Sequence, residues 1–140
     1  LVWDKRLERP ALVMIDEHPA QLTAIHWTTA QENNELLIVG DETGKIYSLD
    51  PRQPKKILHC TKVGKREVTG FSFKGSKEFG IATKTKTAYI YKACIENGFE
   101  PVYEHTSPDV MIYEMTWDLH DEKSFYVIGE EKYAEKVTMS

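Results

Sequence analysis

Apolar and polar positions alternate over short runs in this chain, and turn-forming residues separate the runs. The clearest case is residues 35–51, which read ELLIVGDETGKIYSLDP. Residues 36–39 are aliphatic, residues 40–44 contain two glycines and an aspartate, and residues 45–49 alternate with a period of two. Because side chains of a strand alternate between its two faces, this arrangement predicts a β-hairpin.

The same hairpin pattern recurs along the chain. GIATKTKTAYIYK at residues 80–92 follows the first hairpin by 42 residues, and VIGEEKYAEKVTM occupies residues 127–139. Each hairpin follows an apolar strand that ends in an aromatic residue, and these aromatics, at intervals of 46 and 44 residues, are Trp27, Phe73 and Trp117. The architecture of a β-sandwich does not require an aromatic-ended strand and a hairpin to recur together at a fixed interval. The spacing therefore predicts a repeat array.

A period of about 40 to 45 residues with four strands per unit is typical of WD-repeat propellers. We therefore expect an all-β fold: part of a WD-repeat β-propeller, with about three four-stranded antiparallel blades and part of another. Residues 1–17 are expected to end one blade, 18–62 and 63–105 to form complete blades, and 106–140 to form a last blade without its fourth strand. Since blades bury their faces against each other, the chain is expected to associate with its missing half or with a second copy.

Four short segments carry a closer resemblance to a known family. They are LVWDKR at residues 1–6, VGDETGKIYSLD at 39–50, VTGFSF at 68–73 and EMTWD at 114–118. In this order they resemble the later blades of the methylosome WD-repeat subunit, most of all its divergent Valois-type branch. The resemblance implies a non-catalytic scaffold that partners a type II protein arginine methyltransferase and presents Sm-type or histone substrates. For the Valois-type branch it also implies Tudor-domain partners in germ granules.

The WD-repeat pattern also predicts polar residues that stabilise a blade by hydrogen bonds. Such blades often link a His, a Ser or Thr, an Asp and a Trp by hydrogen bonds, which satisfy buried polar groups. Leu49 stands where the Trp would fall in the first complete blade, so we expect a partial network there. The candidate structural positions of this type are Trp3, Asp4, His18, Asp41 and His105.

Charge is distributed unevenly along the chain. Residues 51–92 hold eleven basic and two acidic side chains, a net charge of +9, whereas residues 1–50 carry −5 and residues 93–140 carry −8. One blade would thus offer a positive surface to an acidic ligand. The candidate partner-binding residues are Lys62, Lys65, Arg66, Lys84 and Lys86.

Other interpretations of this charge and of the repeat stay open. The basic side chains can form a solvated surface that neutralises the adjacent blades, or bind RNA, although no interleaved aromatic residues favour nucleic acid. The chain can also belong to a different WD-repeat scaffold, such as a coat, pore or ubiquitin-ligase subunit. Interaction with a partner protein is the favoured class.

Catalytic, metal-binding and cofactor sites are not predicted. Residues 40–44 lack the Lys-Ser/Thr ending of a phosphate loop, and Cys60 follows His59 directly, so the two would point to opposite faces of a strand. Cys60 and Cys94 have no ligand-like spacing, which favours a reducing compartment, the cytoplasm and also the nucleus. No apolar run approaches the about 18 residues of a membrane span, and no secretory leader is seen.

Overall fold

The computed structural model describes residues 2–3, 10–12, 20–31, 34–53 and 56–140, and every regular element in that part of the chain is a β-strand. A short pair, β1 (Val2–Trp3) and β2 (Pro10–Leu12), precedes three larger antiparallel sheets. In chain order the larger sheets contain β3 (Leu22–Gln31), β4 (Asn34–Asp41), β5 (Lys45–Leu49) and β6 (Ile57–Lys62); β7 (Gly70–Lys74), β8 (Glu78–Ala82), β9 (Thr87–Cys94) and β10 (Gly98–Thr106); and β11 (Ile112–Trp117), β12 (Ser124–Gly129) and β13 (Ala134–Thr138).

The three predicted hairpins are present as β4–β5, β8–β9 and β12–β13. In the first of them Leu37 pairs with Leu49 and Gly40 pairs with Ile46. The turn requires Gly44, whose φ is +90°, because a side chain there would be strained and its Cβ would lie 2.3 Å from the carbonyl oxygen of Gly64. The hairpin prediction is therefore confirmed.

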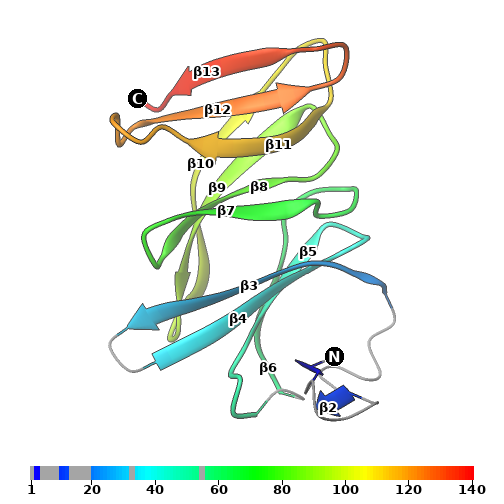
Figure 1. Ribbon diagram of the computed structural model, residues 1–140, viewed down its shortest axis with the longest axis vertical. Coiled ribbons are helices and arrows are strands. Elements are labelled where there is room, and N and C mark those ends of the chain that lie inside the picture. Colours follow the sequence, from blue (N-terminus) through cyan, green and yellow to red (C-terminus); the bar gives the residue numbers. More distant parts are fainter. Residues whose placement is uncertain (1, 4–9, 13–19, 32–33, 54–55) are drawn as a thin grey trace.

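The larger sheets stack face to face in the order of the sequence (Figure 1). The first strands of successive sheets lie next to each other, since β3 contacts β7 and β7 contacts β11. At the opposite edge of the stack β6 contacts β10. Each sheet thus buries a face against its neighbour, which is the arrangement of propeller blades.

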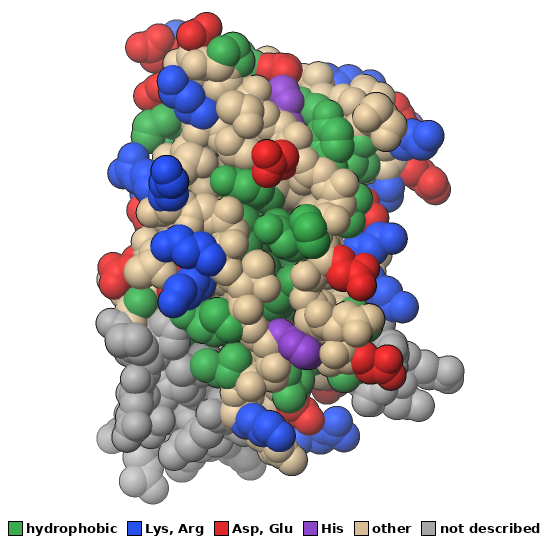
Figure 2. All heavy atoms as spheres, turned by 180° about the vertical axis from the view of Figure 1, so that it is seen from behind, with side chains coloured by type: hydrophobic (Ala, Val, Ile, Leu, Met, Phe, Trp, Pro, Cys, Tyr) green, Lys and Arg blue, Asp and Glu red, His purple; other side chains and the backbone are tan. Residues whose placement is uncertain are grey.

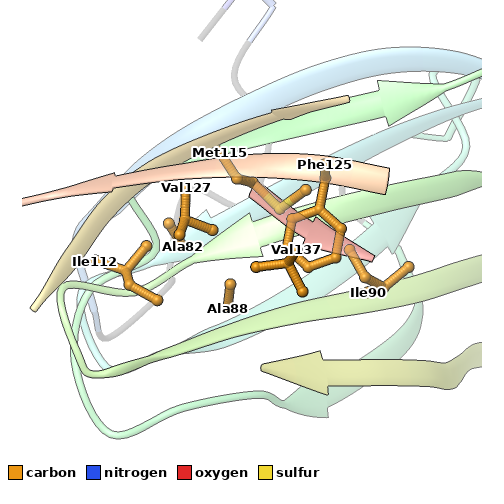
Figure 3. Close-up of a cluster of buried hydrophobic side chains, with 8 residues drawn as sticks. All are labelled: Ala82, Ala88, Ile90, Ile112, Met115, Phe125, Val127 and Val137. Carbon is orange, nitrogen blue, oxygen red and sulfur yellow. The ribbon is translucent and has the colours of Figure 1, made fainter. Parts of the chain in front are cut away.

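Apolar side chains fill the spaces between the sheets. Between the first two sheets, Ile38 and Ile46 belong to the same buried cluster as Phe79 and Ile81. Figure 3 shows the corresponding cluster between the second and third sheets, whose side chains point toward one another. Its members are Ala82, Ala88, Ile90, Ile112, Met115, Phe125, Val127 and Val137. Removal of this apolar surface from water is the main force that holds the stack together.

A threonine in β3 and a threonine just before β7 each make a hydrogen bond to the next sheet or to the segment that leads into it. The hydroxyl of Thr23 donates to the carbonyl oxygen of Val68 at 2.6 Å. Thr69 lies 46 residues later, and its hydroxyl donates to the carbonyl oxygen of Tyr113 at 2.9 Å. The contact between sheets therefore repeats with the same period as the sequence.

The three aromatics of the sequence repeat differ in their surroundings. The ring of Phe73 stacks on His26 of the preceding sheet, with centroids 4.0 Å apart. Trp117 also faces the preceding sheet, because its Nε1 donates to the carbonyl oxygen of Ser72 at 2.8 Å. Trp27 occupies the equivalent position of β3 but is 55% exposed. The repeat thus predicts the position of each aromatic in the sheet, while its burial depends on what covers that face.

Both end faces of the stack carry exposed apolar side chains. Ile25 and Trp27 are exposed on β3, and Tyr126 and Ile128 are exposed on β12. Strand alternation places the latter pair opposite Phe125 and Val127, which pack against the preceding sheet. Association through these faces stays a prediction, as do the divisions after residues 17, 62 and 105. In the described residues we find no helix with the length and apolarity that a membrane crossing requires.

Two glycines at the seams between sheets should respond to alanine in opposite ways. A Cβ on Gly70 would have no atom within 4 Å, whereas a Cβ on Gly40 would lie 2.6 Å from Val68 Cβ, which is buried. Gly70→Ala is therefore expected to raise the free energy of unfolding by about 0.5–1 kcal/mol, because glycine loses more backbone entropy on folding. Gly40→Ala should lower it by about 1–3 kcal/mol through overpacking. Urea denaturation measures both, and shifts of the same sign would contradict the prediction.

Candidate protein-binding surface

The five predicted partner-binding residues lie together at one end of the sheets. Lys62 ends β6, Lys65 and Arg66 follow it in the loop before β7, and Lys84 and Lys86 lie in the turn between β8 and β9. Because β7 and β8 are antiparallel, the loop before β7 and the turn after β8 share one end of the sheet. We call these five side chains the basic cluster. Figure 2 shows basic side chains gathered along the left margin of the molecule, with acidic side chains at the top of the same margin.

Three members of the basic cluster also make contacts within the protein. Lys84 Nζ lies 2.7 Å from Glu67 Oε1, and both side chains are partly exposed. Lys86 Nζ donates to the carbonyl oxygen of Pro108 at 3.1 Å, and Arg66 Nη1 lies 4.0 Å from Met111 Sδ. Lys62 and Lys65 make no hydrogen bond or ion pair to other described residues. Positive charge is therefore available to a ligand on both sides of the Lys84–Glu67 pair.

Other basic residues of the positive stretch that the structure describes lie elsewhere. Arg52 is in the turn between β5 and β6, at the other end of the sheets, and its Nε lies 3.1 Å from Asp50 Oδ1. Its hydrogen bonds lower the pKa of Asp50. Lys74, next to the turn between β7 and β8, donates to the carbonyl oxygen of Glu122. The described part of the positive stretch is thus divided between the two ends of the sheets.

Acidic side chains flank the basic cluster on the adjacent sheets. Glu42 lies in the β4–β5 turn, and Glu130 and Glu131 lie in the β12–β13 turn, at the same end of the stack. Glu42 Oε1 accepts a hydrogen bond from the backbone N–H of Gln21 at 3.1 Å, and Glu130 Oε1 accepts one from that of Met111 at 3.2 Å. An acidic ligand would therefore be attracted to the middle sheet and repelled by both neighbours.

Asp41 organises the turn of the first full sheet. Its carboxylate is 0% exposed and accepts hydrogen bonds from the backbone N–H of Thr43 at 2.8 Å, from the Thr43 hydroxyl at 2.6 Å and from the Tyr47 hydroxyl at 2.6 Å. Burial by itself would raise the pKa of Asp41, but these hydrogen bonds outweigh it and hold the pKa below its ordinary value. Burial raises the pKa of Tyr47, and the neighbouring Asp41 raises it further.

Sequence reasoning missed Thr43 and Tyr47 in this network. It considered only position 49, where the WD-repeat pattern has a Trp donor. Tyr47 lies on the same face of β5 as Leu49, two residues away. The signal in the sequence was therefore a side chain with a hydroxyl group two positions before the position expected for Trp. Tyr47 supplies a donor where Leu49 has none.

The other predicted structural positions give a mixed outcome. Asp4 and His18 lie outside the described residues, and Trp3 is described only as part of β1. His105 lies in β10, and its Nε2 is 3.3 Å from Glu135 Oε1 without the geometry of a hydrogen bond. A WD-type role for these positions stays a prediction. The described residues hold no group of three or more His, Cys, Asp or Glu side chains placed to bind a metal ion.

Comparison with known proteins assigns the fold. No protein-family model and no curated protein matches this sequence. Among solved structures, the β-propeller domain of Cps50 (Swd1) from Myceliophteria thermophila is similar to the chain, with a TM-score of 0.72 and 12% sequence identity over 85% of this chain and 40% of that chain. The chain thus has the fold of part of a WD-repeat-type β-propeller, and the predicted fold class is confirmed. It spans about two fifths of that propeller domain.

Proposed function

We propose that this chain is a non-catalytic scaffold that binds partner proteins through the loop end of its sheets. The basic cluster is the observation that carries the proposal. Its side chains extend from loops that backbone hydrogen bonds hold in place, since the N–H of Val68 donates to Asp41 O at 3.0 Å and that of Ser107 donates to Lys86 O at 2.7 Å. A fixed surface binds with less loss of conformational entropy than a flexible one. The partner that fits it is an acidic segment of a protein.

The finer proposal concerns the identity of the partners. The resemblance of residues 1–6, 39–50, 68–73 and 114–118 to the methylosome WD-repeat subunit supports a type II protein arginine methyltransferase, with Sm-type proteins or histones as substrates. The Valois-type resemblance supports Tudor-domain proteins as further partners. We place the protein in the cytoplasm and also in the nucleus, where such substrates are found. Another WD-repeat scaffold, of a coat, pore or ubiquitin ligase, is the alternative.

A pull-down experiment tests the identity of the partners. The chain, immobilised by a terminal tag, is incubated with a purified type II arginine methyltransferase and with a Tudor-domain protein, each at several salt concentrations. Specific retention of either protein supports the finer proposal. The retention of neither would contradict it and favour a different WD-repeat scaffold.

The basic cluster itself is tested by charge reversal. Changing Lys62, Lys65, Arg66 and Lys86 to Glu, while keeping Lys84 for its ion pair, is expected to weaken binding of a fluorescent oligo-glutamate peptide by roughly tenfold or more at low salt. The dependence of binding on salt should also decrease, because fewer opposite charges meet. Fluorescence anisotropy measures both effects, and circular dichroism verifies the fold.

A matched variant controls for net charge in this experiment. Its four substitutions to Glu lie away from the cluster, at Arg52, Lys56, Lys77 and Lys92. If the control variant weakens binding as much as the cluster variant does, general charge and not the cluster attracts the peptide. Tight RNA binding without peptide binding would indicate a nucleic-acid ligand and overturn the proposal.

A further inference from the structure

A cleft lies along the seam between β7 and β11, the first strands of the second and third sheets. It consists of two adjoining hollows of about 320 and 360 Å³, which share Phe71, Ser72, Glu114 and Met115. Gly70 helps to keep the first hollow open, because it has no side chain and a Cβ there would have no atom within 4 Å. The space is therefore large enough for one long side chain of a ligand.

The walls of the cleft combine polar, apolar and aromatic side chains. Met115 is buried between the second and third sheets and gives both hollows an apolar surface, whereas the Phe71 ring packs in the cluster between the first two sheets, so Phe71 only borders the hollows. Tyr113 lines one hollow and is 41% exposed, and Tyr126 lines the other and is 40% exposed. Lys136 Nζ already lies 5.9 Å from the ring centre of Tyr126. The Tyr113 ring is thus the aromatic surface on which a bound cation can stack.

The uncompensated charge in the cleft is negative. Glu114 is exposed, lines both hollows, and its carboxylate makes no hydrogen bond or ion pair to other described residues. Lys84 lines the first hollow, but Glu67 lies 2.7 Å from its Nζ and neutralises it. A positively charged ligand group would therefore find a free carboxylate here.

We propose that this cleft binds the side chain of an arginine from a peptide partner. The planar guanidinium can donate two parallel hydrogen bonds to the Glu114 carboxylate and stack on the Tyr113 ring. Its aliphatic stem would lie against Met115. A lysine would bind less well, since its ammonium group is a compact charge that neither stacks nor makes the paired hydrogen bonds.

This site adjoins the basic cluster, because Lys84 lines its first hollow, but the two sites differ in charge. The cleft takes a cation through Glu114, whereas the basic cluster takes an anion through Lys62 and Lys65. The two proposals can therefore fail independently, because one is tested with an arginine peptide and the other with a glutamate peptide.

The test is a nuclear magnetic resonance titration of the 140-residue chain with the peptide acetyl-Gly-Arg-Gly-amide. We expect saturable shifts of the amide signals of Gly70, Glu114 and Met115. The same peptide with citrulline, which has the shape of arginine without its charge, should produce no saturable shift. The lysine peptide should bind more weakly than the arginine peptide.

Two variants make the outcome decisive. Glu114→Gln should weaken arginine binding at least about fivefold, while Glu100→Gln, which removes an exposed carboxylate from β10, should leave it unchanged. Gly70→Leu should block the hollow, with retention of the fold checked by its melting temperature. The proposal is overturned if no signals shift, if the shifts lie elsewhere, or if Glu114→Gln binds as the unmodified chain does.

Discussion

Replacing Trp117 with Ala is expected to lower the free energy of unfolding by about 3 kcal/mol, the lower end of the range for buried aromatic residues, because Trp117 is half-buried. The substitution removes the edge-to-face contact with Phe125, whose ring centroid lies 5.8 Å away. It also removes the hydrogen bond from Nε1 to the carbonyl oxygen of Ser72 in the preceding sheet. Phe73→Ala should have a similar effect, since Phe73 stacks on His26 and Phe79.

Trp27 provides the matched control for this prediction. It has the same place in the repeat but is 55% exposed, so Trp27→Ala should cost less than about 1 kcal/mol. Denaturation by urea, followed by circular dichroism, compares the three variants. Equal losses for Trp27→Ala and Trp117→Ala would mean that the sheets do not stack through these aromatics.

These aromatics also show how far the sequence predicts the fold. The hairpins could be predicted because they depend on local features: alternation along a strand and turn formers such as those at residues 40–44. The positions of Trp27, Phe73 and Trp117 followed from the period of the repeat. Their exposure could not be predicted, because it depends on which surface covers each one, and that is a property of the whole stack.

The candidate site was predictable only in part, for a geometric reason. The five residues of the basic cluster lie at one end of the sheets, and their role in partner binding stays a prediction, but the positive stretch as a whole does not form one surface. Each turn of an antiparallel sheet reverses the chain, so successive turns project from opposite ends, and Arg52 lies far along the sheets from Lys65. The pairing of Lys84 with Glu67 and the position of Glu114 beside the cleft depend on contacts between loops and between sheets. A linear count of charges does not contain them.

A second large effect is expected at Asp41, where Asp41→Asn should lower the free energy of unfolding by about 2–3 kcal/mol at neutral pH. The substitution keeps the size of the side chain but removes the charge that accepts hydrogen bonds from Thr43 and Tyr47. The side-chain amide of Asn would also place its own N–H donors next to the donor groups of Thr43 and Tyr47 in a buried site. Asp50→Asn is the control, since Asp50 pairs with an exposed Arg52 and should have little effect.

The pH dependence of stability separates the charge of Asp41 from its shape. The pKa of Asp41 is lower in the folded chain than in the unfolded chain, so ionised Asp41 stabilises the fold above its unfolded pKa, about 3.9. This stabilisation is lost as the pH falls through the lower, folded pKa. The difference in unfolding free energy between the unmodified chain and Asp41→Asn should therefore be largest at neutral pH and decrease below about pH 4. A difference that stays constant from pH 7 to pH 3 would show that Asp41 acts through its shape and not through its charge.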